Sequence, residues 1–188
     1  GAANGNSIDY DITWWENDGS ESFTKRTIDS TFAKARSVYA TDIDGDGDID
    51  VVGASYDDSD INWWENDGTP SNGGWTEHTI DTAFNTARDV HAVDLDKDGD
   101  MDILGASAGA DEVVWWENDG SESFTERVID DNFNGVEGIY PADIDGDGDM
   151  DVVGVANEAD DIVWWENTAT FSFDPTWNAA DIAIDAQT

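Results

Sequence analysis

Three runs of the sequence place an aspartate at every second position. They read "DIDGDGDID" from Asp42, "DLDKDGDMD" from Asp94 and "DIDGDGDMD" from Asp143. Each run therefore carries carboxylates at positions 1, 3, 5, 7 and 9, with a glycine at position 6. So many like charges within nine residues repel one another unless a cation lies among them. The pattern predicts three sites for a hard cation.

The spacing within each run matches a calcium loop. Calcium binds about six to eight oxygen atoms, and a glycine at position 6 allows the sharp turn that wraps such a loop around the ion. We expect the side chains at positions 1, 3, 5 and 9 and the main-chain oxygen at position 7 to bind calcium, so that the position 7 side chains serve the local field or the turn. The predicted metal sites comprise Asp42, Asp44, Asp46, Asp48 and Asp50; Asp94, Asp96, Asp98, Asp100 and Asp102; and Asp143, Asp145, Asp147, Asp149 and Asp151.

An EF-hand begins with a similar pattern and has to be distinguished from these runs. An EF-hand requires an acidic residue at position 12 and a helix on each side of the loop. Position 12 is glycine here, at Gly53, Gly105 and Gly154, and the flanking residues read as strands. The EF-hand interpretation therefore fails. Solvated acidic turns without an ion are the other alternative, and three copies with the same glycine argue against it.

The composition limits the partners that this chain can bind. The 188 residues include 45 acidic and 7 basic side chains, which gives a formal charge of -38. Without clusters of Lys and Arg, nucleic acid and anionic membrane surfaces are excluded as partners. No segment is long and apolar enough for membrane insertion, and the absence of cysteine excludes thiolate metal sites. The 10 Trp, 7 Phe and 4 Tyr supply the apolar surface of a folded core.

The sequence contains an internal repeat. The motif "WWEN" begins at Trp14, Trp63, Trp115 and Trp164, at intervals of 49, 52 and 49 residues. The aspartate runs follow one another at intervals of 52 and 49 residues, so both motifs share one period. The longer interval has a local cause, because the segment after Asn66 carries three additional residues. A period of this length indicates a repeat architecture.

Each repeat reads as four short strands. In the second repeat, apolar segments bounded by turn residues cover 35–41, 49–54, 61–66 and 75–81. No stretch keeps the apolar spacing of a helix over three turns. The sequence therefore predicts an all-β fold of β-propeller blades, each with four antiparallel strands. In such a fold both Trp residues of a pair can be buried, because a neighbouring blade covers each face of the sheet.

About three and a half blades are expected. The predicted units are a half blade of two outer strands in 1–30, blades with a calcium loop in 31–82 and 83–131, and in 132–188 a third such blade with a divergent last strand. Only Trp177 and Ile182 still indicate that last strand. Propellers usually close with about four to eight blades. We therefore expect this chain to belong to a larger propeller or to associate with another copy of itself.

The motifs resemble a known family of repeats. The pattern "DxDxDGxxD", followed by an apolar strand and Gly-Ala in units with a "WWEN" strand, is similar to the FG-GAP/VCBS repeats. These repeats build calcium-binding propellers of the integrin α-subunit type, of many secreted bacterial proteins and of fungal lectins. The resemblance covers nearly the whole chain, and it implies a propeller with three calcium ions. The "FG" half of the signature is absent, which favours the VCBS-like branch.

Few residues are available for catalysis. His78 and His91 belong to no repeated group, and no Ser-His-Asp arrangement or phosphate-binding loop is present. Arg36 and Arg88 recur near the inner strand, and we expect them to pair with neighbouring aspartates. The sequence therefore predicts that the chain is not an enzyme.

The expected function is recognition or adhesion by a secreted calcium-binding module. Its ligand would be a glycan or a protein, and the sequence assigns no residue to that ligand. Part of a polysaccharide lyase and a structural spacer in a surface protein are the alternatives, since a fold alone does not fix a function. Calcium loops of extracellular modules bind with dissociation constants on the order of 0.1–1 mM. Cytosolic calcium is too scarce to fill them, so we expect an extracellular location.

Overall fold

The computed structural model describes residues 11–158, 160–168 and 177–181. These residues form strands, with one short 3-10 helix at Pro70–Asn72, which confirms the all-β prediction. Trp177 begins the last strand, as expected, while Ile182 lies outside the described residues. The described part of the chain contains no helix with the length and apolar character needed to cross a membrane.

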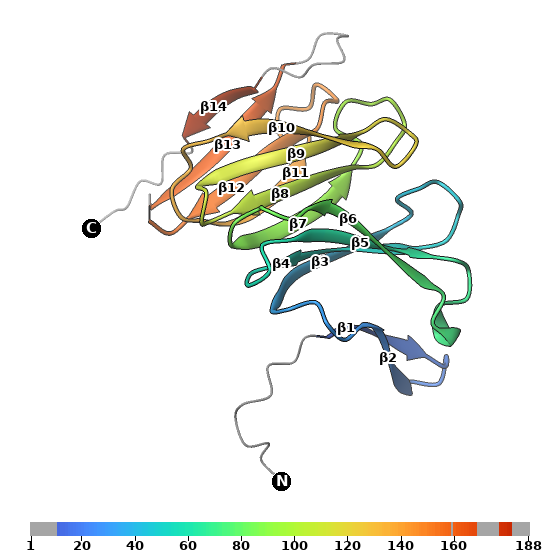
Figure 1. Ribbon diagram of the computed structural model, residues 1–188. Helices are drawn as coiled ribbons and strands as arrows, with labels where there is room; N and C mark the ends of the chain where they lie inside the picture. Colours follow the sequence, from blue (N-terminus) through green and yellow to red (C-terminus); the bar gives the residue numbers. More distant parts are fainter. Residues whose placement is uncertain (1–10, 159, 169–176, 182–188) are drawn as a thin grey trace.

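The strands form four antiparallel sheets that follow one another along the chain (Figure 1). In each larger sheet the strands are hydrogen-bonded in chain order, as in a propeller blade. The first sheet has two strands and the others have four: β1 (Ile12–Asn17) and β2 (Phe23–Asp29); β3 (Ala35–Thr41), β4 (Asp50–Ser55), β5 (Ile61–Asn66) and β6 (Trp75–Asp81); β7 (Ala87–Val93), β8 (Asp102–Ser107), β9 (Glu112–Asn118) and β10 (Phe124–Asp130); β11 (Val136–Ala142), β12 (Asp151–Ala156), β13 (Asp161–Asn167) and β14 (Trp177–Asp181).

The strand boundaries in the second repeat follow the turn residues. β3, β5 and β6 cover the predicted segments, and β4 begins at Asp50, one residue later than predicted. The difference arises because Asp50 is the first residue paired with β3, opposite Thr41. Ile49 precedes the ladder and is 53% exposed. Each aspartate run thus connects two adjacent strands of one sheet.

The first strands of the three larger sheets are neighbours, because β7 contacts both β3 and β11. The carboxylate of Asp89 on β7 joins them: it accepts hydrogen bonds from Ser37 Oγ at 2.7 Å and from the Ile139 amide at 3.0 Å. Burial favours a higher pKa for Asp89, but these hydrogen bonds and the contact with His91 outweigh it and lower the pKa below its ordinary value. The inner strands are therefore held together by a charged carboxylate.

Two arginines of the inner strands also contact the fourth sheet. Arg88 Nη1 lies 3.2 Å from Glu137 Oε2, and Arg36 Nη2 lies 3.8 Å from the same oxygen. The expectation that these arginines pair with neighbouring aspartates is wrong, since the acid that they reach belongs to β11. The reason is that the three inner strands lie side by side, which brings residues one or two repeats apart in the sequence into contact.

The core lies between the sheets and is built from the Trp pairs. Trp63 and Trp64 follow each other on β5 and are at most 2% exposed, but they belong to different apolar clusters, one on each face of the sheet. Trp115 and Trp116 on β9 are divided in the same way. The prediction that both members of a pair are buried is confirmed for these sheets. In the first sheet, Trp15 is 57% exposed.

A glycine on the second strand of each larger sheet makes room for the second Trp. A Cβ on Gly105 would lie 2.7 Å from Trp116 Cζ3 and 3.0 Å from Phe84 Cε1. Phe84 meets Trp116 edge to face, with 4.9 Å between the ring centroids. Gly53 and Gly154 occupy the corresponding places against Trp64 and Trp165. The glycine at position 12 of each run is therefore a packing requirement.

We predict that Gly105→Ala destabilises the protein by roughly 1–3 kcal/mol, because the added methyl overlaps two rings that are packed on all sides. Urea unfolding at saturating calcium measures the difference. The matched control is Gly138→Ala, where the new Cβ would lie 3.6 Å from its nearest neighbour, an ordinary contact. Equal stability of the two variants would contradict this account of position 12.

Candidate metal centre

Three carboxylates converge in each aspartate run, at positions 1, 3 and 9. Each side chain offers one oxygen, and the three oxygens lie within 4.8 Å of one another. Since calcium–oxygen distances are about 2.3–2.6 Å, oxygens with this separation can share one ion. The three groups are Asp42, Asp44 and Asp50; Asp94, Asp96 and Asp102; and Asp143, Asp145 and Asp151. The structure thus forms one carboxylate triad in each larger sheet.

The position 9 aspartate anchors the loop to the sheet. Asp102 is fully buried; one oxygen accepts a hydrogen bond from the Leu95 amide and the other from the Asn118 amide, both at 2.9 Å. Asp50 and Asp151 make the corresponding two bonds. Each carboxylate oxygen has a second lone pair, which leaves it able to bind a cation. The residue therefore belongs both to the fold and to the metal site.

The asparagine of "WWEN" completes this anchor, a role that our sequence reasoning missed. Asn118 Nδ2 donates to the Met101 carbonyl at 3.2 Å, and its Oδ1 accepts from the Gly120 amide at 3.2 Å. Asn66 makes the same pair of contacts with Ile49 and Gly68. The signal was available, because the asparagine recurs in all four copies of the motif. In each larger sheet, the asparagine of this motif is thus hydrogen-bonded to the end of an aspartate loop.

The side chains at position 5 lie outside the triads. Asp46, Asp98 and Asp147 are exposed, and each accepts a hydrogen bond from the amide at position 7, at 2.8–2.9 Å. Their part in binding an ion stays a prediction, as does that of the main-chain oxygen at position 7. In this geometry the position 5 carboxylates shape the turn of the loop.

The side chains at position 7 contact a neighbouring turn or loop. Asp48 lies over Gly68, where a Cβ would come 2.8 Å from its Oδ2, and Asp100 lies over Gly120 in the same way. Asp149 instead forms an ion pair with Lys97 of the preceding loop. Gly68 and Gly120 of the Asn-Asp-Gly turns in the second and third sheets therefore leave room for an aspartate of the neighbouring loop.

Among the described residues, the carboxylates of the second triad lie close together without a full set of hydrogen bonds. Asp94 Oδ1 and Asp96 Oδ2 are buried, with no hydrogen-bond partner in the described part of the chain. Burial raises the pKa of both side chains. It raises the pKa of Asp102 to about 7, and the negative charges of Asp96 and Asp98 act in the same direction. A bound cation would supply the missing partner and reverse these shifts, so the residues fit a metal ion.

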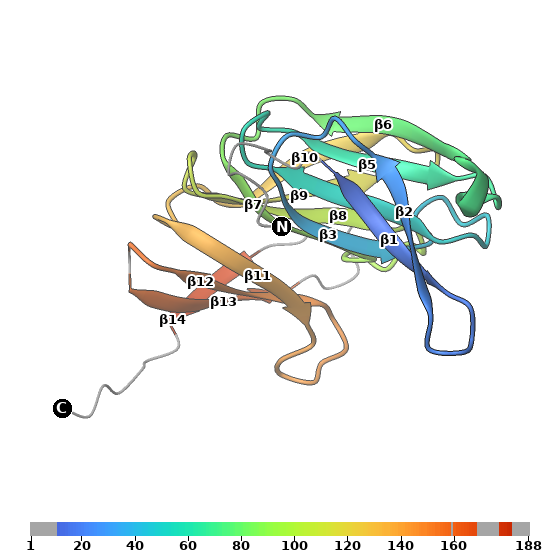
Figure 2. The ribbon, with the colours of Figure 1, turned by 90° about the horizontal axis from the view of Figure 1, so that it is seen from below.

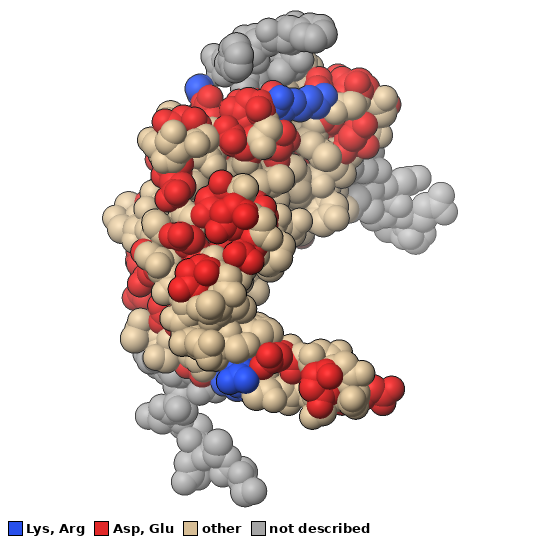
Figure 3. All heavy atoms as spheres, turned by 90° about the vertical axis from the view of Figure 1, so that its right-hand side faces the viewer, with Lys and Arg blue, Asp and Glu red and all other residues tan. Residues whose placement is uncertain are grey.

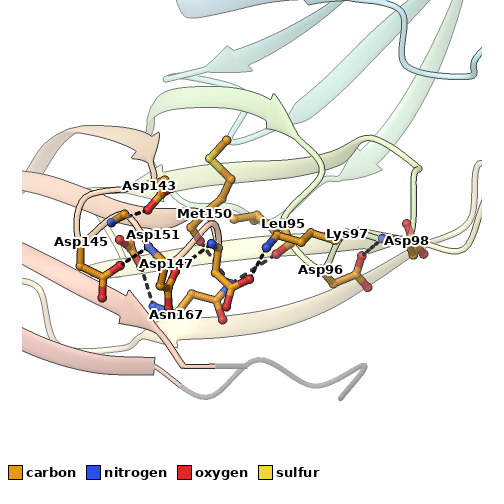
Figure 4. Close-up of polar contacts among 12 residues, drawn as sticks. Leu95, Asp96, Lys97, Asp98, Asp143, Asp145, Asp147, Met150, Asp151 and Asn167 are labelled. Carbon is orange, nitrogen blue, oxygen red and sulfur yellow. Dashed lines mark hydrogen bonds and ion pairs between the residues drawn. The ribbon is translucent and has the colours of Figure 1, made fainter. Parts of the chain in front are cut away.

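The second and third loops are in direct contact across the boundary between their sheets (Figure 4). Lys97 stands at position 4, where the other two runs have glycine, and its ammonium group pairs with Asp149. This hydrogen bond raises the pKa of Lys97. Asn167 Nδ2 donates to the Leu95 carbonyl at 3.3 Å. Lys97 and Asp149 therefore link the two aspartate loops directly, and Asn167 at the end of β13 adds a contact to the second loop.

The surface around the triads is strongly acidic. Figure 3 shows Asp and Glu side chains gathered in successive patches along one face of the array, with few Lys and Arg among them. The face is hollowed on the side where the two-stranded sheet projects. Such a field attracts cations to the loops.

The repeat pattern is recognised by a family model. A model described as an FG-GAP-like repeat matches residues 2–53, 42–105 and 94–154. The chain belongs to this family. Each match of an FG-GAP-like repeat ends at the glycine of position 12, and the second and third begin at position 1 of an aspartate run. No curated protein matches this FG-GAP-like chain.

Metal binding to the second triad is predicted to depend on pH. The raised pKa of about 7 means that metal-free Asp102 holds a proton at pH 6 and has lost it at pH 8. Since a cation binds the carboxylate, binding at pH 6 must release that proton, and the affinity of this site falls by about tenfold per pH unit below 7. Calorimetry in buffers of different ionisation enthalpy, at pH 6 and pH 8, counts the protons.

Asp102→Asn tests this assignment, because it removes the titrating group together with a ligand of the second triad and so should remove the proton release of that site. The variant is expected to release one proton fewer at pH 6 and the same number at pH 8. If the wild type released equal numbers of protons at both pH values, the assignment to Asp102 would be wrong.

Proposed function

We propose that this chain is a calcium-binding propeller segment that serves recognition or adhesion outside the cell, with a glycan or a protein as its ligand. The observation that carries the proposal is the carboxylate triad, built in the same way in three successive sheets. All of its ligand atoms are carboxylate oxygens, without histidine or cysteine. Oxygen ligands of this kind suit calcium and magnesium rather than zinc or copper.

The number of carboxylates in each triad favours calcium over magnesium. Magnesium requires about 2.0–2.1 Å to each ligand in a strict octahedron and usually keeps several waters, with one or two carboxylates from the protein. Each triad brings three carboxylates together, with one oxygen of each lying within 4.8 Å of the others. Calcium accepts this number of carboxylates more readily than magnesium does. Calcium loops of extracellular modules bind with dissociation constants on the order of 0.1–1 mM, and this affinity range is the reason for the proposed extracellular location.

A role in recognition rather than catalysis is supported by the positions of the two histidines. His78 Nε2 lies 2.9 Å from Glu65 Oε2, and the ring stacks on Trp63 with 4.4 Å between the centroids. His91 lies between Tyr39 and Tyr140, with its Nε2 3.5 Å from Asp89 Oδ2. Both rings thus take part in contacts between strands. The acidic loop face in Figure 3 is the surface that we propose for the ligand.

Calcium removal is predicted to destabilise the protein. With a dissociation constant of roughly 0.1 mM, millimolar calcium contributes about 1.4 kcal/mol per site, or about 4 kcal/mol for three sites. We expect three calcium ions per chain by equilibrium dialysis and a lower melting temperature in EGTA. Asp96→Asn should leave two ions per chain, because the second triad loses a carboxylate.

Asp119→Asn is the matched control for Asp96→Asn, since Asp119 is exposed and outside the metal loops. It should bind three ions and melt as the wild type does. A melting temperature that does not respond to EGTA would overturn the calcium proposal, and two ions bound by both variants would overturn the assignment of the second site.

A glycan array probed with and without calcium tests the recognition part of the proposal. We expect binding to a set of related glycans in millimolar calcium, its loss in EGTA, and its return when calcium is restored. The same binding in both conditions would contradict calcium-dependent recognition. An array without any calcium-dependent signal would exclude the glycans tested and leave a protein as the proposed ligand.

A further inference from the structure

An apolar cavity of about 220 Å³ lies between the first and second sheets. Trp14 and Ile28 line it from the first sheet, and Ile49, Val51 and Trp75 line it from the second. Trp14 Nε1 is buried and has no hydrogen-bond partner among the described residues. We refer to this cavity as the socket.

The corresponding place at the next sheet boundary is filled by an aliphatic side chain. Ile43, at position 2 of the first aspartate run, is 3% exposed and belongs to one apolar cluster with Trp63, Ile80, Ile103 and Phe124. By the repeat period these four residues correspond to Trp14, Ile28, Val51 and Trp75 of the socket. Leu95, at position 2 of the second run, is likewise buried in one apolar cluster with the next set of corresponding residues: Trp115, Ile129, Val152 and Trp177. At both of these sheet boundaries, the apolar space is therefore filled by the side chain at position 2 of an aspartate loop.

The sheet beside the socket also presents a free edge. Among the described residues β1 pairs with β2 alone, whereas β5 and β9 are each paired on both sides. Trp15 is 57% exposed, while Trp64, its counterpart on β5, is covered by Gly53 and Phe32. Figure 2 shows β1 and β2 as a separate pair of strands beside the larger sheets. The pair lacks the strand that covers the second Trp elsewhere.

The polar groups at this edge are already in place. Asn17 Oδ1 accepts a hydrogen bond from the Gly19 amide at 2.9 Å, the arrangement that Asn66 and Asn118 have with their glycines. In the complete sheets the amide of this asparagine donates to a position 9 aspartate. The edge is therefore prepared for the carboxylate of a further aspartate loop.

We propose that the socket and the free edge of β1 bind an inner hairpin of an FG-GAP-like repeat, from a polypeptide segment outside these 188 residues. The hairpin consists of a strand, an aspartate loop with Ile or Leu at position 2, and a strand with glycine at position 12. Its aliphatic side chain fills the socket, its position 9 carboxylate accepts from the Asn17 amide, and its glycine lies against Trp15. The proposal is independent of the ligand proposed above.

Two observations decide the occupant. Residues 1–10 carry no aspartate run and cannot supply the loop. The three inner hairpins of a second copy are already paired with their own outer strands, through β4 and β5, β8 and β9, and β12 and β13. A hairpin without outer strands of its own is therefore the element that fits.

The test uses the full chain in calcium and a labelled peptide with the sequence of residues 35–55, which is an inner hairpin of this repeat. Fluorescence polarisation should show saturable binding, and sedimentation should show a 1:1 complex. A peptide with Ile43→Asp should bind at least about tenfold more weakly, because burying Ile is worth roughly 1.5–3 kcal/mol. Equal affinity of the two peptides would overturn the proposal.

Variants of the full chain locate the binding surface. Ile49→Glu places a charge at the rim of the socket on a residue that is 53% exposed, so the fold is expected to persist. Val128→Glu is the control, since Val128 is 49% exposed on β10 and does not line the socket. Only Ile49→Glu should abolish binding of the peptide. The chain without peptide is also tested for self-association. If it self-associates and Ile49→Glu abolishes that association, a second copy is the occupant and the proposal is overturned.

A tethered hairpin removes the dependence on peptide folding. The same 21 residues, joined by a flexible linker ahead of the full chain, should add a fourth calcium ion and raise the melting temperature by several degrees. The tethered sequence with Ile43→Asp should not raise it. If neither the free nor the tethered hairpin has these effects, the socket does not bind an inner hairpin. The number of calcium ions bound by the chain without a tethered hairpin is measured separately, and it tests the calcium proposal alone.

Discussion

The buried carboxylate at the start of each second strand is the constraint on which the rest of each sheet depends. A carboxylate out of contact with water is costly unless hydrogen bonds or a cation compensate. Asp102 meets this condition through the amides of Leu95 and Asn118, and its triad could add a metal ion. In doing so it joins the beginning of the loop, the second strand and the end of the third strand. The geometry of the triad and the register of the sheet therefore follow from one residue.

The same short loop also controls how one sheet packs on the next. Position 2 enters the core of the following sheet, as Ile43 and Leu95 do, while the carboxylates at positions 1, 3 and 9 converge in a triad that could hold a metal ion. The loop thus directs consecutive side chains to different surroundings, which permits both roles within three residues. Further along, the glycine at position 12 admits the Trp of the third strand. Packing and metal binding are thus specified by one stretch of twelve residues.

Much of this could be read from the sequence because the signals are local and repeated. The boundaries of β3, β5 and β6 follow from apolar alternation ended by turn residues, and the triads follow from the aspartate spacing. The contacts that the sequence did not reveal join residues about fifty positions apart. Arg88 with Glu137 and Asp89 with the Ile139 amide depend on the inner strands lying side by side, which no local pattern specifies.

The double role of Ile43 and Leu95 has a mechanical consequence. Each side chain belongs to an aspartate loop and is also buried in the adjacent sheet, so a force that pulls two sheets apart acts on the loop and on the carboxylates that could hold an ion. A bound ion would stiffen the loop against that load, and its loss would let the boundary between the sheets yield. With calcium as that ion, the array would resist tension in calcium-rich surroundings and become extensible as calcium is withdrawn.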